Sequence, residues 1–121
     1  MLSPQSLVHR WNDLPKDAPM PLLERRRIIG EKMMISQVLL TKGCDVPSHS
    51  HPNEQFACLL SGKLRFGLGP PGAADYQEIV LNRGEVLHLP SNLPHSAFAL
   101  EDCVILDMFS PPSQKTGIDR Q

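Results

Sequence analysis

The sequence predicts an all-β protein that folds as a single antiparallel sandwich or barrel. Short apolar runs follow one another with a turn signal every several residues, and none of them has a convincing helical period. The run KLRFGL at residues 63–68 places Leu or Phe at every second position, as a strand with one buried face requires. A chain of 121 residues is long enough for one domain with its own core and too short for a second.

We expect three regions within this one domain. Residues 1–30 form an N-terminal arm and the first strand or strands, residues 31–110 form the barrel, and residues 111–121 form a C-terminal tail. Residues 1–21 contain four of the twelve prolines around a short apolar piece at 7–11. This composition is typical of an arm that makes one strand-like contact.

The expected strands follow one another along the chain. The run at 22–30 reads as a strand, and the run at 33–41 is too short and too β-branched for a helix and ends at a Lys-Gly turn signal. The run at 55–60 closes at Ser-Gly and leads into 63–68, which predicts a β-hairpin with one dry and one wet face. After a loop at 69–75, further strands are expected at 76–82, 84–90, 95–100 and 103–110, before two prolines stop the pairing.

Three consecutive arginines, Arg25, Arg26 and Arg27, lie within the apolar frame of the strand at 22–30. One interpretation is a half-exposed strand with two arginines pointing outward. The alternative is that one of them reaches an anionic substrate, because an arginine of opposite parity must point to the other face of the sheet.

Composition narrows the range of partners and the compartment. Twelve basic and 13 acidic residues give a formal net charge of −1, so the chain has no excess of positive charge that would indicate binding to nucleic acid or to a membrane surface. No stretch approaches the roughly 20 apolar residues of a membrane span, and the N-terminus has no apolar leader. Three cysteines without CxxC spacing argue against a disulfide framework and favour a reducing cytoplasm. The expected partner is a small molecule.

The stretch GCDVPSHSHPNEQFACLLSG, residues 43–62, carries the clearest chemical signal. His49, His51 and Gln55 share parity, so their side chains can converge on one side of a sheet if the chain is extended. His95 lies in a second glycine-led block, GEVLHLPSNLPHSAF. Converging imidazoles suit a divalent metal, so the sequence predicts a metal held inside a small barrel by three histidines and one amide or carboxylate.

Both blocks resemble the two signature motifs of the cupins. The first motif has glutamine where glutamate is usual: Gly43, five residues, His49-x-His51, three residues, Gln55, six residues, Gly62. The second has asparagine in place of a glycine, and a later alanine, Ala99, in place of an asparagine: Gly84, five residues, Pro90-x-Asn92, two residues, His95. The resemblance covers about residues 33–109 and implies an RmlC-like jelly-roll barrel of antiparallel strands with a metal at its core.

The resemblance implies four metal ligands, His49, His51, Gln55 and His95. Glu54 competes with Gln55 because a carboxylate is the better ligand for a cation, but parity and the cupin spacing both select Gln55 and turn Glu54 away. Four neutral ligands leave the charge of a divalent ion uncompensated, which favours Lewis-acid chemistry over oxygenation. The choice among Fe, Mn, Ni, Co and Zn stays open.

Three other potential ligands are not expected to bind the metal. His88 has no spacing partner and is interpreted as structural. Cys44 and Cys58 are even-numbered, so they face away from the ligands unless a bulge intervenes.

The strand at 103–110 adds a carboxylate and an aromatic ring. Asp107 and Phe109 share parity with Ile105. If that face points into the barrel, Asp107 could act as a general acid or base and Phe109 could stack on a sugar ring. The alternative is that Asp107 pairs with an arginine and Phe109 simply packs.

The runs LDMFSPP and HSHPNEQ resemble a narrower group, the small pectin-degradation (KdgF-type) cupins, which open 4,5-unsaturated uronates to linear keto forms. This resemblance implies catalytic roles for Asp107 and Phe109, and an arginine at the position of Ser113. The missing guanidinium would remove a charge-assisted contact worth roughly 1.5–3 kcal/mol. Candidate replacements are Lys115, Arg25 and Arg27.

The expected protein is a cytoplasmic cupin with one divalent metal that opens the ring of, or isomerises, a sugar acid or related keto compound. A homodimer is expected because cupin barrels commonly pair through their outer sheets and N-terminal arms. Two alternatives stay open. One is a metal-dependent dioxygenase. The other is a non-catalytic binding or sensor cupin, and the serine at position 113 in place of the arginine is the feature that supports it.

Overall fold

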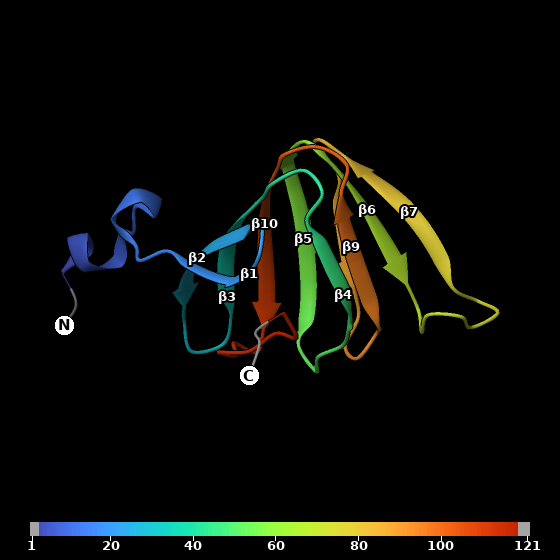
Figure 1. Ribbon diagram of the computed structural model, residues 1–121. Coiled ribbons are helices and arrows are strands. Elements are labelled where there is room, and N and C mark those ends of the chain that lie inside the picture. Colours follow the sequence, from blue (N-terminus) through green and yellow to red (C-terminus); the bar gives the residue numbers. More distant parts are fainter. Residues whose placement is uncertain (1–2, 119–121) are drawn as a thin grey trace.

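The computed structural model describes residues 3–118, which fold into two β-sheets that face each other (Figure 1). Within these residues two short 3-10 segments, η1 (Pro4–Leu7) and η2 (Trp11–Asp13), precede the strands. The strands are β1 (Asp17–Met20), β2 (Leu23–Ile29), β3 (Met34–Leu40), β4 (Asp45–His49), β5 (Glu54–Ser61), β6 (Lys63–Leu68), β7 (Gln77–Asn82), β8 (Val86–Leu89), β9 (His95–Ala99) and β10 (Cys103–Ser110).

The chain passes repeatedly from one sheet to the other. The larger sheet has the order β1-β2-β3-β10-β5-β8 and the smaller has the order β4-β9-β6-β7, with antiparallel pairing throughout. From β3 to β6 every strand lies in the sheet opposite to its predecessor, and the same holds from β7 to β10. This exchange between two packed sheets is the jelly-roll arrangement, so the predicted all-β, antiparallel jelly-roll fold is confirmed.

The predicted hairpin between residues 55–60 and 63–68 is wrong. Both segments are strands, but β5 pairs with β10 and β8, whereas β6 pairs with β9 and β7. Gly62, with a φ of 94°, turns the chain from one sheet into the other, and a Cβ there would collide with the chain that enters β10. Alternation in 63–68 correctly predicts that Leu64 and Phe66 are buried. The alternation contains no information about which strands pair with each other.

The N-terminal arm lacks the strand-like contact that was predicted at 7–11. It contains η1 and η2, extends away from the sheets in Figure 1, and leaves Leu7 and Val8 63% and 59% exposed. The first strand is β1, which pairs with β2 at the edge of the larger sheet. No helix within residues 3–118 is both long enough and apolar enough to cross a bilayer.

Polar residues gather at one end of the otherwise apolar space between the sheets. Two adjacent rows cross the inner face of the larger sheet at this end. Residues of one row, from β2, β3, β10 and β5, are Arg27, Ser36, Asp107 and Ala57. Residues of the next row, from β3, β10, β5 and β8, are Met34, Phe109, Gln55 and Leu89. The core fills the remaining space with residues such as Val38, Leu59, Leu64 and Ile105.

Candidate metal centre

Three histidine side chains converge at the polar end of the barrel. His49 is the last residue of β4, His51 lies in the connection to β5, and His95 is the first residue of β9. One ring nitrogen from each histidine lies within 4.8 Å of the other two, and the ring centroids are 4.3–5.9 Å apart. The three side chains could therefore hold one metal ion between them.

A β-bulge explains how His49 reaches this cluster. Val46 pairs with Ala97 while His49 pairs with His95, so β4 uses three residues where β9 uses two. The extra residue reverses the parity of the strand and allows both Val46 and His49 to point inward. His51 lies beyond the end of β4, and its ring meets that of His49 as the sequence predicts.

The same bulge means that Cys44, which differs in parity from His49, also points inward. Cys44 precedes the bulge and is fully buried in the apolar core, with its Sγ 3.7 Å from the carbonyl oxygen of Pro21. Cys58 is half-buried in β5. Within residues 3–118, the cluster of three histidines that could hold a metal contains neither thiol.

Backbone carbonyls orient all three rings. Each Nδ1 lies 2.9–3.0 Å from a carbonyl oxygen two residues away, which belongs to Pro47 for His49, Asn53 for His51 and Leu93 for His95. A carbonyl oxygen only accepts, so each Nδ1 donates a proton and a neutral ring keeps its lone pair on Nε2. Such contacts set the tautomer and the direction of metal-binding histidines.

Gln55 adds a fourth donor atom to the cluster. Its Oε1 lies 3.0 Å from Nε2 of His51, and its Nε2 donates to Oδ1 of Asp107 at 2.9 Å, which holds the amide oxygen toward the histidine. Since a neutral His51 carries its proton on Nδ1, Nε2 and Oε1 face each other as two lone-pair atoms. A cation bound to both would satisfy them, so the residues present fit a divalent metal.

Glu54 faces the outside of the larger sheet, as parity predicts. Its Oε2 lies 2.6 Å from Nε2 of His88 on β8, and both side chains are about half exposed. This outward contact agrees with the interpretation of His88 as structural. Of the two neighbours Glu54 and Gln55, only Gln55 therefore faces inward.

Burial favours the neutral, metal-binding form of the His49 and His95 rings. Desolvation lowers the pKa of His95 to about 4, against a smaller opposing effect of the Leu93 carbonyl. Desolvation also lowers the pKa of His49, and the Pro47 carbonyl again opposes it. At neutral pH these rings are therefore available as ligands without first losing a proton.

Asp107 carries a carboxyl group that titrates near neutral pH. Burial raises its pKa from 3.8 to about 7, and the hydrogen bond from Gln55 opposes this rise. Such a carboxyl exists in both protonation states at physiological pH, so it can accept a proton and return it.

A cavity of about 60 Å³ lies between these polar groups and the apolar core. His49, His95, Gln55, Asp107 and Phe109 all line it. The ring of Phe109 is also edge-on to His51, with 5.6 Å between centroids. The structure therefore brings the predicted ligands and the two predicted catalytic residues to one place.

The sequence did not predict that three residues of the tail lie against the cavity or against a histidine of the cluster. Thr116 and Ile118 line the cavity, and Gly117 lies against the ring of His49. At the start of the tail, the buried side chain of Asn53 donates a hydrogen bond from Nδ2 to the carbonyl oxygen of Pro111. The Thr-Gly-Ile run in an otherwise polar tail is the only sequence signal that could have indicated these residues.

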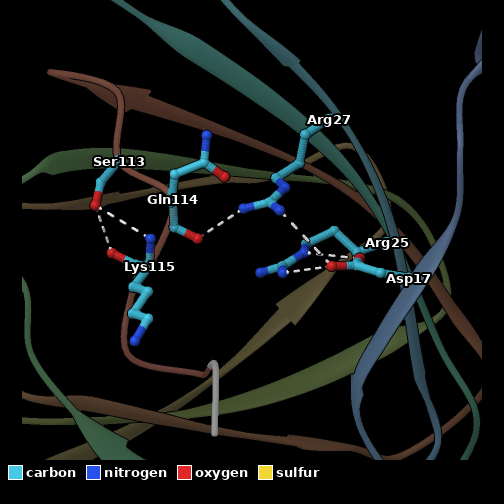
Figure 2. Close-up of polar contacts among 6 residues, drawn as sticks. All are labelled: Asp17, Arg25, Arg27, Ser113, Gln114 and Lys115. Atoms are coloured by element: carbon cyan, nitrogen blue, oxygen red, sulfur yellow. Dashed lines mark hydrogen bonds and ion pairs between the residues drawn. The ribbon is translucent and has the colours of Figure 1, made fainter. Parts of the chain in front are cut away.

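The prediction of two outward-facing arginines on β2 is wrong. Arg25 and Arg27 point inward, and only Arg26 takes the opposite parity, with Nη1 3.5 Å from Oε1 of a glutamine on β3. Figure 2 shows Arg25 donating to Asp17 from Nε at 3.1 Å and from Nη2 at 2.8 Å, and Arg27 donating from Nη1 to the carbonyl oxygen of Gln114 at 2.8 Å.

Ser113 and Lys115 form a local turn in the tail. Oγ of Ser113 donates to the carbonyl oxygen of Lys115 at 2.7 Å and lies 3.2 Å from its backbone nitrogen, and the ammonium group points away from the two arginines (Figure 2). Among the described residues that line the cavity, neither Ser113 nor Lys115 is found. Arg25 and Arg27 do not line the cavity either, because together with Asp17 they line a separate pocket beside β1 and β2. None of the three candidate replacements for the missing guanidinium therefore reaches the cavity while the tail is in place.

Comparisons with known proteins agree with this architecture. Residues 36–109 match the cupin domain family. The structure is similar to that of KdgF from Halomonas sp., with 22% identity, a TM-score of 0.75, and coverage of 85% of this chain and 91% of that chain. It is also similar to an RmlC-like cupin from Shewanella frigidimarina NCIMB 400, with 18% identity, a TM-score of 0.79, and coverage of 89% and 93%.

A third similar structure is the oxalate decarboxylase of Bacillus subtilis, a protein with Mn(II) centres, at 20% identity and a TM-score of 0.77. The match covers 88% of this chain and 30% of that one. No curated protein sequence matches the chain. These low identities show a shared fold, whereas the domain match extends over more than half of the sequence, and on that ground the chain belongs to the cupin family.

Proposed function

We propose that this cupin is a metal-dependent enzyme that opens the ring of, or isomerises, a small sugar acid, with 4,5-unsaturated uronates as the preferred substrates. The observation that carries the proposal is the position of Asp107. Its carboxyl group, with a pKa of about 7, accepts a hydrogen bond from the amide whose oxygen faces the histidine cluster. A group that can give and take a proton thus lies beside the donor atoms of a candidate metal centre.

His49, His51, His95 and Gln55 would hold the ion. When bound, a divalent metal would supply Lewis acidity to an oxygen atom of the substrate. All four donors are uncharged, so the protein does little to stabilise a higher oxidation state of iron or manganese. This is the physical reason for preferring ring opening or isomerisation to oxygenation.

Asp107 would move the proton. Opening the ring of an unsaturated uronate removes a proton from the anomeric hydroxyl, and formation of the keto product adds one to C4. One carboxyl group can perform both transfers in turn when both of its protonation states are populated. Gln55 positions Oδ1 of Asp107 through the 2.9 Å hydrogen bond, and Phe109 offers an apolar wall on which a sugar ring can stack.

Two likenesses to the KdgF-type cupins support the substrate class. The run LDMFSPP resembles that of the KdgF-type cupins, and the Halomonas KdgF structure has the same fold. A non-catalytic binding cupin is the second candidate, because Ser113 stands where the KdgF-type pattern has an arginine.

The decisive experiment combines metal analysis with a substrate assay. Elemental analysis of the purified protein gives the metal, and the fully loaded protein is then mixed with 4,5-unsaturated galacturonate while the conjugated absorbance and dissolved oxygen are followed. Loss of absorbance without oxygen uptake is expected. Oxygen uptake with bound iron would favour a dioxygenase, and an unchanged spectrum would exclude the proposed reaction.

We also propose a homodimer that covers the outer face of the larger sheet. On the neighbouring strands β5 and β8, Phe56, Leu60 and Val86 are 43–55% exposed and form an apolar strip, and the arm presents Leu7 and Val8 outside the body of the domain. A second copy would bury these surfaces. Light scattering should give the mass of a dimer, and Phe56→Glu should reduce it to that of a monomer.

A further inference from the structure

The C-terminal segment 113–118 covers the end of the barrel where the candidate metal centre lies. Figure 1 shows the tail crossing below the ends of β10 and β5. Thr116 is 4% exposed, and Ile118 packs against the core. Ligand pockets usually measure roughly 300–1,000 Å³, so the cavity of about 60 Å³ beneath this cover has room for a few water molecules and not for a sugar acid.

The fit of Gly117 shows how closely the cover is seated. A Cβ at this position would lie 2.8 Å from Cγ of His49 and 3.0 Å from its Cβ, and would overlap Cδ2 of the ring. The φ of +95° adds strain for any residue with a side chain. Position 117 therefore accepts only glycine while the cover is closed.

Arg27 holds the cover through a neutral acceptor. Its side chain is 19% exposed, its Nη1 donates to the carbonyl oxygen of Gln114 at 2.8 Å, and its Nη2 lies 3.7 Å from Oδ2 of Asp17 (Figure 2). A carboxylate binds a guanidinium more strongly than a main-chain carbonyl does, because both partners are then charged. An anion that reaches Arg27 would thus compete with the tail for the same N–H group.

The sheet register connects Arg27 with the proposed proton-transfer group. Arg27 pairs with Ser36, and Ser36 pairs with Asp107, so the two functional residues lie in one row with a small buried serine between them. Two strand spacings separate their backbones by roughly 10 Å. A sugar acid whose reacting end is at Asp107 could therefore extend its carboxylate over Ser36 to the guanidinium.

We propose that segment 113–118 is a displaceable cover and that Arg27 is the residue that exchanges it for substrate. The carboxylate of a sugar acid takes the guanidinium from the Gln114 carbonyl, and the body of the sugar occupies the space vacated by Thr116 and Ile118. The proposal rests on the proposed function in taking the substrate to be an anion. It assigns to Arg27 the anion recognition that Ser113 cannot perform.

Limited trypsin digestion of the metal-loaded protein tests this exchange. Cleavage after Lys115 requires the buried Thr116 to leave its site, so the rate at which residues 116–121 are lost, followed by mass spectrometry, reports opening of the cover. Galacturonate should accelerate this cleavage about tenfold, because a charge-assisted contact replaces a neutral one. Galactose, which lacks the carboxylate, should leave the rate unchanged.

Two pairs of variants separate the exchange from general loosening. Arg27→Gln should be cleaved faster without ligand and lose its response to galacturonate, whereas Arg26→Gln, on the opposite face of β2, should behave as the unmodified protein does. Gly117→Ala should also open the cover. Gly72→Ala is its control, since Gly72 has a φ of +81° and a Cβ added there would meet nothing within 4 Å.

The results of these experiments distinguish a failure of the exchange at Arg27 from a failure of the proposed reaction. Galacturonate that slows cleavage or leaves it unchanged would overturn the exchange, and so would an Arg27→Gln variant that still responds. If unsaturated uronate is consumed with the same KM by Arg27→Gln and by the unmodified protein, the exchange fails while the function stands. If galacturonate opens the cover through Arg27 but no uronate is consumed, anion recognition stands and the proposed reaction fails.

Discussion

Replacing Gln55 with glutamate, the residue usual at this position in the cupin motif, should destabilise the metal-free protein at neutral pH. The Gln55 amide donates to Oδ1 of Asp107 at 2.9 Å. Glutamate has no N–H group and would bring a second carboxyl oxygen to the same distance. Two carboxylates so close cannot both ionise, so the Gln55→Glu protein must hold a shared proton that the solvent withdraws as the pH rises.

The expected loss can be estimated from the contact that disappears. A hydrogen bond to a charged group that is lost inside a protein costs about 2–3 kcal/mol. At about 4 °C per kcal/mol for a domain of this size, the Tm of the metal-free variant at pH 8 should fall by about 8–12 °C. Because a shared proton raises the folded-state pKa of the pair, the lost stability should return as the pH is lowered toward 5.

Calorimetry of chelator-treated protein at pH 5 and pH 8 measures this difference. Glu54→Gln is the matched control, since Glu54 lies next to Gln55 on β5 but faces the outside. Added metal should reverse the order, because a carboxylate ligand binds a divalent ion more tightly than an amide and stabilises the folded state by mass action. A metal-free Gln55→Glu protein as stable as the unmodified one at pH 8 would refute the assigned coupling of Gln55 and Asp107.

Three further predictions concern Asp107, the histidines and Gly62. Asp107→Asn should lower kcat for a uronate by about 100-fold or more. Since burial raises the pKa of Asp107 to about 7, its stability contribution is present below pH 4 and lost by pH 8, so metal-free Asp107→Asn should exceed the unmodified protein in Tm at pH 8 and not at pH 4. His51→Ala should lose stoichiometric metal in elemental analysis while His88→Ala keeps it, and equal metal in both would contradict the ligand set. Gly62→Ala should unfold about 2–4 kcal/mol more easily in urea than Gly43→Ala, because both glycines have positive φ but only at Gly62 would a Cβ collide with the chain.

Strand positions could be predicted closely because period-two alternation is a local property. Residues 103–110 were expected as a strand and form β10, with Asp107 and Phe109 on the inward side as parity requires. The same local signal failed for the pairing of 55–60 with 63–68. Alternation records which face of a strand is buried, and many partners can bury the same face.

At the candidate site, too, the sequence predicted which residues take part but not how the fold brings them together. Motif spacing selected His49, His51, Gln55 and His95, and these side chains do lie together. The route by which they meet was not foreseen, since a bulge in β4 restores the inward direction of His49 after Val46. A bulge depends on the register of two strands distant in sequence, so one strand read alone does not reveal it.

By itself the sequence determined the fold class, the strand periodicity and the identity of the residues with metal-binding chemistry, because each of these follows from short-range spacing and side-chain type. Only the tertiary structure decided the inward direction of Arg25 and Arg27, the contact between Gln55 and Asp107, and the placement of Gly117 against His49. These features join β2, β5, β10 and the tail. They arise from packing between segments that lie far apart along the chain, and no local pattern encodes such contacts.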